Sequence, residues 1–293
     1  MGSSRSGSSW LLRMLESTGR VVPIDDPHLG HHLGIWRPIP LAWAAADSEP
    51  ELTTLDEVKR DKDSYFFSDR YREAWLPNLR NLVASRFRAE AEDYSAANGI
   101  ENPAIVVKEP GSQAAPLLFE LFPHSSLVFL LRDGRDVVDS WLDAYQRDSW
   151  AQEEGAFAVT RQGRIPLIRW LASVWVFRTR AVWQAFRDRD PSRRVLVRYE
   201  ELLADTPHEL RRIATAIGLD ANGHDLDGVA RRLEFNRLTP RERGAGKETR
   251  AAAPGSWRRN MSRLEQRAMI EVLHPMLSES GYEAVERRSR AAA

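Results

Sequence analysis

Apolar residues in this chain form short continuous runs and longer stretches in which they recur every three or four positions. The continuous runs predict buried strands, because a strand covered on both faces is apolar throughout. They are Val21–Ile24, Ala104–Lys108, Leu127–Leu131 and Val195–Val197. The periodic stretches predict helices. These span Trp10–Thr18, Asp69–Ala97, Ala114–Leu121, Asp136–Tyr145, Pro166–Arg189, Thr206–Ile217 and Ser262–Ser280.

The order of these elements, strands separated by helices, predicts the α/β fold class. We expect a single domain over residues 1–285 with a central parallel sheet of about four to five strands flanked by helices, similar to P-loop NTPases. Helical insertions at about 36–98 and 149–166 are expected on the substrate side, and residues 286–293 are expected to form a flexible tail. Aromatic residues in the insertions favour an apolar or aromatic small-molecule substrate, although such residues also commonly form core.

The composition of the 293 residues excludes several classes of protein. Hydrophobic residues make up 42% and charged residues 29%, as in globular proteins. No apolar run approaches the roughly 20 residues of a membrane span, and the N-terminus does not resemble a signal peptide, so we expect a cytoplasmic protein. Lysine and arginine balance aspartate and glutamate at 42 each, which gives no argument for a nucleic-acid partner. There is no cysteine, and the oligomeric state stays open.

The segment Gly2–Ser9 has the spacing of a phosphate-binding loop and precedes the first predicted helix. Its small residues allow backbone N–H groups to face an anion, and the helix N-terminus adds partial positive charge. Ser8 stands where a nucleoside triphosphatase has lysine, and Arg5 lies inside the loop instead, which argues against ATP or GTP chemistry. The alternative is a flexible Ser/Gly-rich tail.

Four segments resemble motifs of the sulfotransferases that use 3′-phosphoadenosine-5′-phosphosulfate (PAPS), in the same order along the chain. Arg5–Trp10 (RSGSSW) is similar to their 5′-phosphosulfate-binding loop, and Leu131–Trp141 (LRDGRDVVDSW) to their 3′-phosphate-binding segment. Arg198–Leu202 (RYEEL) and Gly255–Trp257 (GSW) resemble two later motifs. The resemblance implies transfer of a sulfonate group from PAPS to a hydroxyl of a small-molecule acceptor, which we expect to be a secondary metabolite or a lipid, without a metal.

The resemblance also implies which residues bind PAPS. The 5′-phosphosulfate ligands are Arg5, Ser6, Gly7, Ser8, Ser9 and Trp10. Arg132 and Ser140 bind the 3′-phosphate, and Tyr199 contacts the adenine. Arg250 is a second 3′-phosphate ligand, with Arg258 or Arg259 as substitutes. The alternatives are an Arg132 that pairs with Asp133 or Asp136, and a Tyr199 that is ordinary core.

The catalytic residues implied by the resemblance are Arg5, Lys108 and a general base. Lys108 ends a strand and approaches the bridging oxygen that leaves with the phosphate. Pro110 stands where many family members have the basic histidine, so the base is expected to be Asp26, with His28 and Glu109 as substitutes. Aspartates beside proline are also common turn residues. His28, His31 and His32 would allow a metal site, but we expect these histidines to belong to an ordinary polar loop.

Two further expectations concern the start of the chain and competing functions. The family has an apolar strand before the loop, where this chain offers Met1 and Gly2, so we expect about five apolar residues upstream. A P-loop nucleotide kinase requires a lysine at position 8 and an acidic residue closing a strand, whereas Lys108, Arg132 and Arg198 close the strands here. A degenerate PAPS-binding protein without catalysis is the other alternative.

Overall fold

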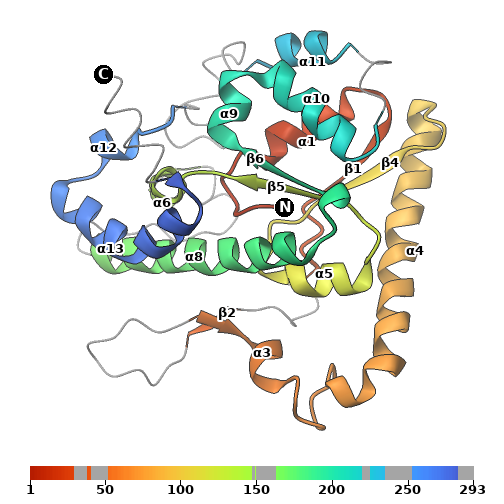
Figure 1. Ribbon diagram of the computed structural model, residues 1–293, viewed down its shortest axis with the longest axis horizontal. Helices are drawn as coiled ribbons and strands as arrows, with labels where there is room; N and C mark the ends of the chain where they lie inside the picture. The colour runs from red at the N-terminus through yellow and green to blue at the C-terminus, as the bar shows by residue number, and fades with distance from the viewer. Residues whose placement is uncertain are drawn as a thin grey trace.

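The computed structural model describes residues 1–29, 38–40, 52–146, 149, 163–219, 225–234 and 253–282. Helices and strands alternate along most of this length (Figure 1). In chain order the elements are α1 (Ser8–Glu16), β1 (Val21–Asp25), β2 (Pro38–Pro40), β3 (Leu52–Thr54), α3 (Leu55–Lys59), η1 (Asp69–Tyr71), α4 (Arg72–Asn98), β4 (Ala104–Lys108), η2 (Ser112–Ala114), α5 (Ala115–Leu121), β5 (Leu127–Leu131), α6 (Gly134–Ala144), α8 (Arg164–Asp188), η4 (Pro191–Arg193), β6 (Arg194–Arg198), α9 (Tyr199–Ala204), α10 (Thr206–Ala216), α11 (Leu226–Arg232), α12 (Trp257–Asn260) and α13 (Arg263–Glu279).

The parallel strands form two separate pairs. β1 pairs with β4, from Val21 opposite Ala104 to Asp25 opposite Lys108. β5 pairs with β6 in the same parallel sense. The α/β class is therefore confirmed, but the prediction of one central sheet of four to five strands is not, because β4 and β5 form no ladder with each other. The only other ladder among the described residues joins β2 to β3, antiparallel.

A cavity of about 680 Å³ separates the two pairs. Its walls come from both neighbouring strands, β4 and β5, and from α1, and most of the lining side chains are apolar. Where this cavity approaches the Gly2–Ser9 loop, the Met1 carbonyl accepts a hydrogen bond of 2.8 Å from the Leu130 amide. The expectation of an apolar strand before Met1 stays a prediction.

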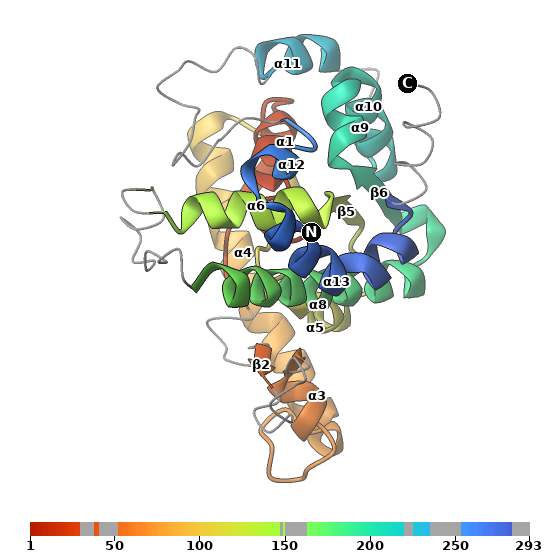
Figure 2. The ribbon, with the colours of Figure 1, turned by 90° about the vertical axis from the view of Figure 1, so that its left-hand side faces the viewer.

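Helices cover both faces of β5 and β6. Figures 1 and 2 show α8 and α13 on one side of these strands, and α1, α9 and α10 on the other. The side chains of β5 follow the two-residue alternation of a strand. Phe129 and Leu131 pack into the cluster formed with α6, α8 and α13, while Leu130 packs into the cluster formed with α1, α9 and α10.

Capping residues explain where several helices begin. The Asp133 carboxylate accepts the Arg135 amide at the start of α6, and the Ser262 hydroxyl forms a capping box with Glu265 at the start of α13. The predicted helices agree with the observed ones to within about two residues at most ends, as expected of boundaries set by caps and periodicity. The short helices α3, α9, α11 and α12 were not predicted, because four to seven residues give too little periodicity.

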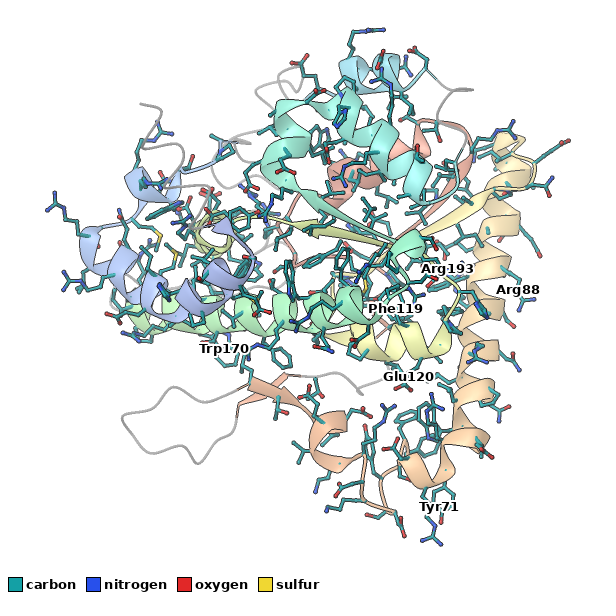
Figure 3. All side chains as sticks on the ribbon, in the orientation of Figure 1. Tyr71, Arg88, Phe119, Glu120, Trp170 and Arg193 are labelled. Atoms are coloured by element: carbon teal, nitrogen blue, oxygen red, sulfur yellow. The ribbon has the colours of Figure 1, made fainter. Side chains whose placement is uncertain are left out.

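An arm formed by β2, β3, α3 and η1 extends from the layered body (Figure 1). The first turns of α4 belong to it, and Tyr71 lies at its far end (Figure 3). α4 has 27 residues, which corresponds to about 40 Å, so it connects the tip of the arm with the strands. None of the described helices is both long and apolar enough to cross a membrane.

Candidate functional site

The phosphate-loop segment folds tightly against the strand ends before it enters α1. Gly7 has a left-handed backbone, with φ of 88°. A Cβ at this position would lie 2.6 Å from the Tyr199 ring, so only glycine fits. Arg5 is also left-handed, with φ of 67°, and the Ser3 and Ser6 side chains are buried. The first backbone N–H groups of α1 have no partner within the helix, which makes this end suited to an anion.

Two arginines from distant parts of the chain meet at this loop. The Arg5 side chain donates from Nε to the Ser140 hydroxyl at 3.1 Å. Arg132, which follows β5 directly, donates from Nη1 to the Arg5 carbonyl at 2.8 Å. Within the described chain, the buried Nε of Arg132 has no hydrogen-bond partner, and the same is true of the Ser3 hydroxyl. Two buried donors at the loop thus have no protein partner among the described residues, which favours an anion in that place.

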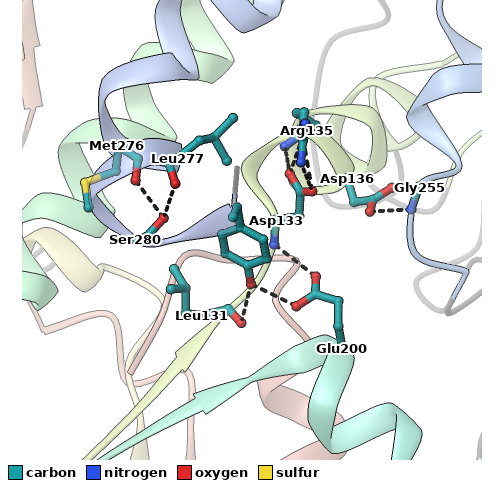
Figure 4. Close-up of polar contacts among 10 residues, drawn as sticks. Leu131, Asp133, Arg135, Asp136, Glu200, Gly255, Met276, Leu277 and Ser280 are labelled. Carbon is teal, nitrogen blue, oxygen red and sulfur yellow. Dashed lines mark hydrogen bonds and ion pairs between the residues drawn. The ribbon is translucent and has the colours of Figure 1, made fainter. Parts of the chain in front are cut away.

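The aspartates beside Arg132 are occupied by other groups (Figure 4). The Asp133 carboxylate pairs with Arg135 at 2.7 Å, and Asp136 accepts the Gly255 amide at 2.7 Å. Burial raises the pKa of Asp136. Arg132 forms no ion pair with either aspartate among the described contacts, so its charge stays available to the loop.

Tyr199 lies against Arg132, and the late glycine–tryptophan motif contacts the start of α6 through Asp136 and Arg135. The Tyr199 ring is 5% exposed. It contacts Trp10 edge to face at 6.3 Å and lies 4.5 Å below the Arg132 guanidinium. The exposed Arg258 guanidinium stacks at 4.4 Å on Trp257, the buried first residue of α12. Arg250 lies outside the described residues.

Lys108 forms the second cluster at the loop. The pairing of β1 with β4 places Asp25 opposite Lys108. The ammonium lies 2.6 Å from Asp25 and 2.9 Å from Asp26, and it donates to the Ser9 hydroxyl at 2.8 Å. β1 therefore does end in an acidic residue, contrary to the expectation that only basic residues close the strands. Sequence analysis missed Asp25, although its place at the end of an apolar run was a signal.

The two substitutes for the general base have different surroundings. Glu109 is 2% exposed, and its two oxygens accept the Leu29 amide at 3.0 Å and the Gly111 amide at 2.8 Å. Burial raises the pKa of Glu109. Its engaged oxygens favour a structural role, holding the segment after β1 to the end of β4. His28 is exposed and, like Asp26, has a left-handed backbone.

A further cation at the loop, Arg178 of α8, was missed by sequence analysis. Its Nη1 donates to the Ser4 hydroxyl at 3.2 Å and its Nε to the Gln113 side chain at 3.1 Å. The signal was present in the pattern, because position 178 follows the buried Trp175 by three residues and precedes the buried Val182 by four.

Metal ligands are not gathered at this site. Over the part of the chain that the structure describes, no three histidine, aspartate or glutamate side chains are placed to hold a metal ion. His31 and His32 lie outside that part.

Comparisons with known proteins show the family and the fold of the chain. The family model described as "Sulfotransferase family" matches residues 1–223. Sulfotransferase STF9 from Mycobacterium avium shares 12% sequence identity, with a TM-score of 0.51 over 95% of this chain and 75% of that one, a likeness that shows the fold alone. A sulfotransferase from Alicyclobacillus acidocaldarius (12% identity, TM-score 0.46, 94% of each chain) also matches. So does mouse SULT7A1 complexed with PAP (14%, 0.47, 99% of this chain and 96% of that one). No curated protein matches the sequence significantly.

Proposed function

Because the chain belongs to the sulfotransferase family, we propose that it transfers a sulfonate group from PAPS to a hydroxyl of a small-molecule acceptor. Membership supports the reaction class, and the identity of the donor is our inference from the site. One observation carries it: Arg5, Ser140 and Arg132, from three distant segments, meet at a glycine-bearing loop and leave a buried arginine donor unsatisfied. Such donors fit a nucleotide that carries phosphates at both its 3′ and 5′ positions.

On the nucleotide side, we assign the 3′-phosphate to Arg132 and Ser140 and the 5′ end to the loop amides and Arg5, whose side chain also contacts Ser140 and so lies between the two phosphates. The Tyr199 ring packs against both the Arg132 guanidinium and Gly7, so it fixes the position of the loop relative to the arginine. Trp10 packs against Tyr199 in turn, and its own position is fixed because its indole donates to the Leu233 carbonyl at 2.8 Å.

On the acceptor side, Lys108 and Asp26 would perform the chemistry. PAPS supplies the electrophilic sulfur and a phosphate leaving group. Asp26 accepts the proton of the acceptor hydroxyl, and Lys108 stabilises the charge that develops on the leaving oxygen. The contact from Lys108 to Ser9 supports this assignment, because it brings the ammonium to the loop while it still pairs with Asp26. Asp25 is the alternative base, since it pairs with the same ammonium.

The chemical class of the acceptor is inferred from the aromatic residues of the first insertion. Aromatic residues of the first insertion pack on one another, Tyr65 and Phe66 each on Phe67 and Phe67 on Trp75, so these rings form the core of the arm. Phe66 is still 77% exposed. A small hydroxyl compound, such as a secondary metabolite or a lipid, is our proposal, and a screen of acceptors with labelled PAPS would identify it.

Binding of 3′-phosphoadenosine 5′-phosphate (PAP) tests the donor assignment. PAP should raise the melting temperature, whereas ATP, which lacks the 3′-phosphate, should do so far less. Arg132→Ala should weaken PAP binding about 10- to 100-fold, because a hydrogen-bonded charge is lost. Arg267→Ala, an exposed position on α13, is the matched control and should bind PAP normally. Equal stabilisation by ATP and PAP would favour a nucleotide kinase, and tight PAP binding without transfer to any acceptor would favour a degenerate binding protein.

A further inference from the structure

Arg178 is a half-buried charged residue on the inner side of a helix, α8. Along α8 the buried residues recur with helical spacing, at Ile168, Leu171, Trp175 and Val182. Arg178 lies beside this stripe, next to the buried Thr179, and its own side chain is half-buried. Trp175, one turn earlier, packs against Gly134 at the start of α6. The guanidinium is consequently directed at the region between α6, the loop and the segment after β4.

The contacts of this guanidinium are neutral. Ser4 offers a hydroxyl and Gln113 an amide oxygen, and none of the ion pairs formed within the described chain involves Arg178. Burial lowers the pKa of Arg178, which reflects the cost of keeping a charge away from water. A buried cation is normally paired with an anion.

Glu109 is the candidate for that anion within the described part of the chain. It interacts electrostatically with Arg178. However, its two oxygens already accept the backbone amides of Leu29 and Gly111, and burial raises its pKa. Glu109 therefore supplies weak compensation, and the arrangement calls for an anion from outside the chain.

The neighbouring loop residues Ser4 and Arg5 have side chains that point to different parts of the site, which indicates the part of a ligand that Arg178 would face. The Arg5 side chain turns to Ser140 of α6, where the 3′-phosphate is proposed to bind. The Ser4 side chain turns instead to Arg178, which also contacts Gln113 and interacts electrostatically with Glu109, the residue after Lys108. Arg178 thus lies on the side of the loop where the acceptor chemistry is proposed.

We propose that Arg178 binds the sulfonate group of PAPS, an assignment that rests on the proposed function. In the transfer, the bond between the sulfur and the bridging phosphate oxygen breaks, and the electron pair stays with that oxygen. A new bond forms between the sulfur and the acceptor oxygen, whose proton passes to the base, and PAP is released. Arg178 holds the sulfonate oxygens during this exchange, so it should distinguish PAPS from PAP.

The test compares the dissociation constants of PAPS and PAP, measured by calorimetry without acceptor. Arg178→Gln should weaken PAPS binding about 10- to 100-fold and leave PAP binding within about twofold. Arg178→Lys, which keeps the charge, should recover part of the PAPS affinity. Arg180→Gln is the matched control, because position 180 lies on the same helix and is exposed. Melting temperatures show whether each variant is folded.

Three other outcomes are informative. Equal loss of PAPS and PAP affinity would overturn the proposal in favour of structural support for the loop. Unchanged affinity for both would also overturn it, and would redirect attention to an anionic group on the acceptor. If the wild-type protein binds neither PAPS nor PAP, the proposed function fails rather than the assignment of Arg178. Should Arg178→Gln not fold, Arg178→Lys should still show a smaller loss confined to PAPS, and no selective loss in that variant would overturn the proposal.

Discussion

The two sides of the phosphate loop hold their cations differently. On the nucleotide side, Arg132 stacks on a buried tyrosine and donates to a loop carbonyl, and the adjacent aspartates are engaged elsewhere. On the acceptor side, Lys108 is shared by Ser9, Asp25 and Asp26, and the two carboxylate side chains are 57% and 42% exposed.

This difference suits two tasks. A planar guanidinium fixed by stacking presents donors in a constant direction, which suits recognition of a phosphate. An ammonium on a flexible stem with several partners can change partners as charge moves during a reaction. We therefore expect substitutions on the nucleotide side to change binding and those on the acceptor side to change turnover.

The largest expected effect is that of Asp26→Asn on turnover. If Asp26 accepts the proton of the acceptor, its loss should lower turnover about 10²- to 10⁴-fold, with PAP affinity nearly unchanged. The rate should also lose its fall at acidic pH, because that fall reports protonation of the base. Asp25→Asn is the matched control, since Asp25 pairs with the same lysine. Near-normal turnover in Asp26→Asn together with a large loss in Asp25→Asn would assign the base to Asp25.

The second effect concerns Gly7, which connects the loop with the nucleotide side. Gly7→Ala combines a left-handed backbone with a Cβ 2.6 Å from the Tyr199 ring. We expect a loss of about 1–3 kcal/mol in unfolding free energy and weaker PAP binding, because the displaced ring also supports Arg132. Gly19→Ala separates the two causes, since Gly19 is left-handed with nothing within 4 Å. That control should lose stability but not PAP affinity; if both variants bind PAP equally well, the ring contact does not matter for binding.

The smallest effect is the pH dependence contributed by Glu109. Burial raises the pKa of this carboxyl above its usual 4.5, so the folded protein holds the proton more firmly than the unfolded chain. Its contribution to stability is present below pH 4.5 and is lost as the pH rises through the folded pKa. Glu109→Gln stays neutral, so its stability relative to wild type should improve between pH 4.5 and pH 8, by about 1.4 kcal/mol per unit of pKa shift.

Urea unfolding at the two pH values measures this difference for Glu109→Gln. Glu101→Gln, an exposed position before β4, serves as the control and should show no such trend. A Glu109→Gln difference that does not change with pH would mean that the carboxyl titrates normally.

Much of the secondary structure could be predicted from the sequence, because it depends on residues close to one another in the chain. The runs at β4 and β5 were predicted at both ends, because continuous apolar residues followed by lysine or arginine leave little freedom in the boundaries. The turn before α1 was recognised because glycine spacing acts within a few residues, while its phosphate-binding role stays a prediction. The break in the sheet was not predicted, since it depends on whether the facing edges of β4 and β5 are paired with another strand. A segment of about five apolar residues added before Met1 would test the expected strand by raising the melting temperature.

The sequence by itself determined the class of elements and the basic residues at the ends of β4, β5 and β6, because periodicity, composition and capping act locally. Only the tertiary structure decided which of these residues meet. It brought Arg5 to Ser140, 135 positions away, placed Asp25 as well as Asp26 on Lys108, and directed Arg178 at Ser4 across 174 positions. Such encounters depend on how helices pack across the strands, and no local pattern in the sequence encodes the distance between two side chains on different elements.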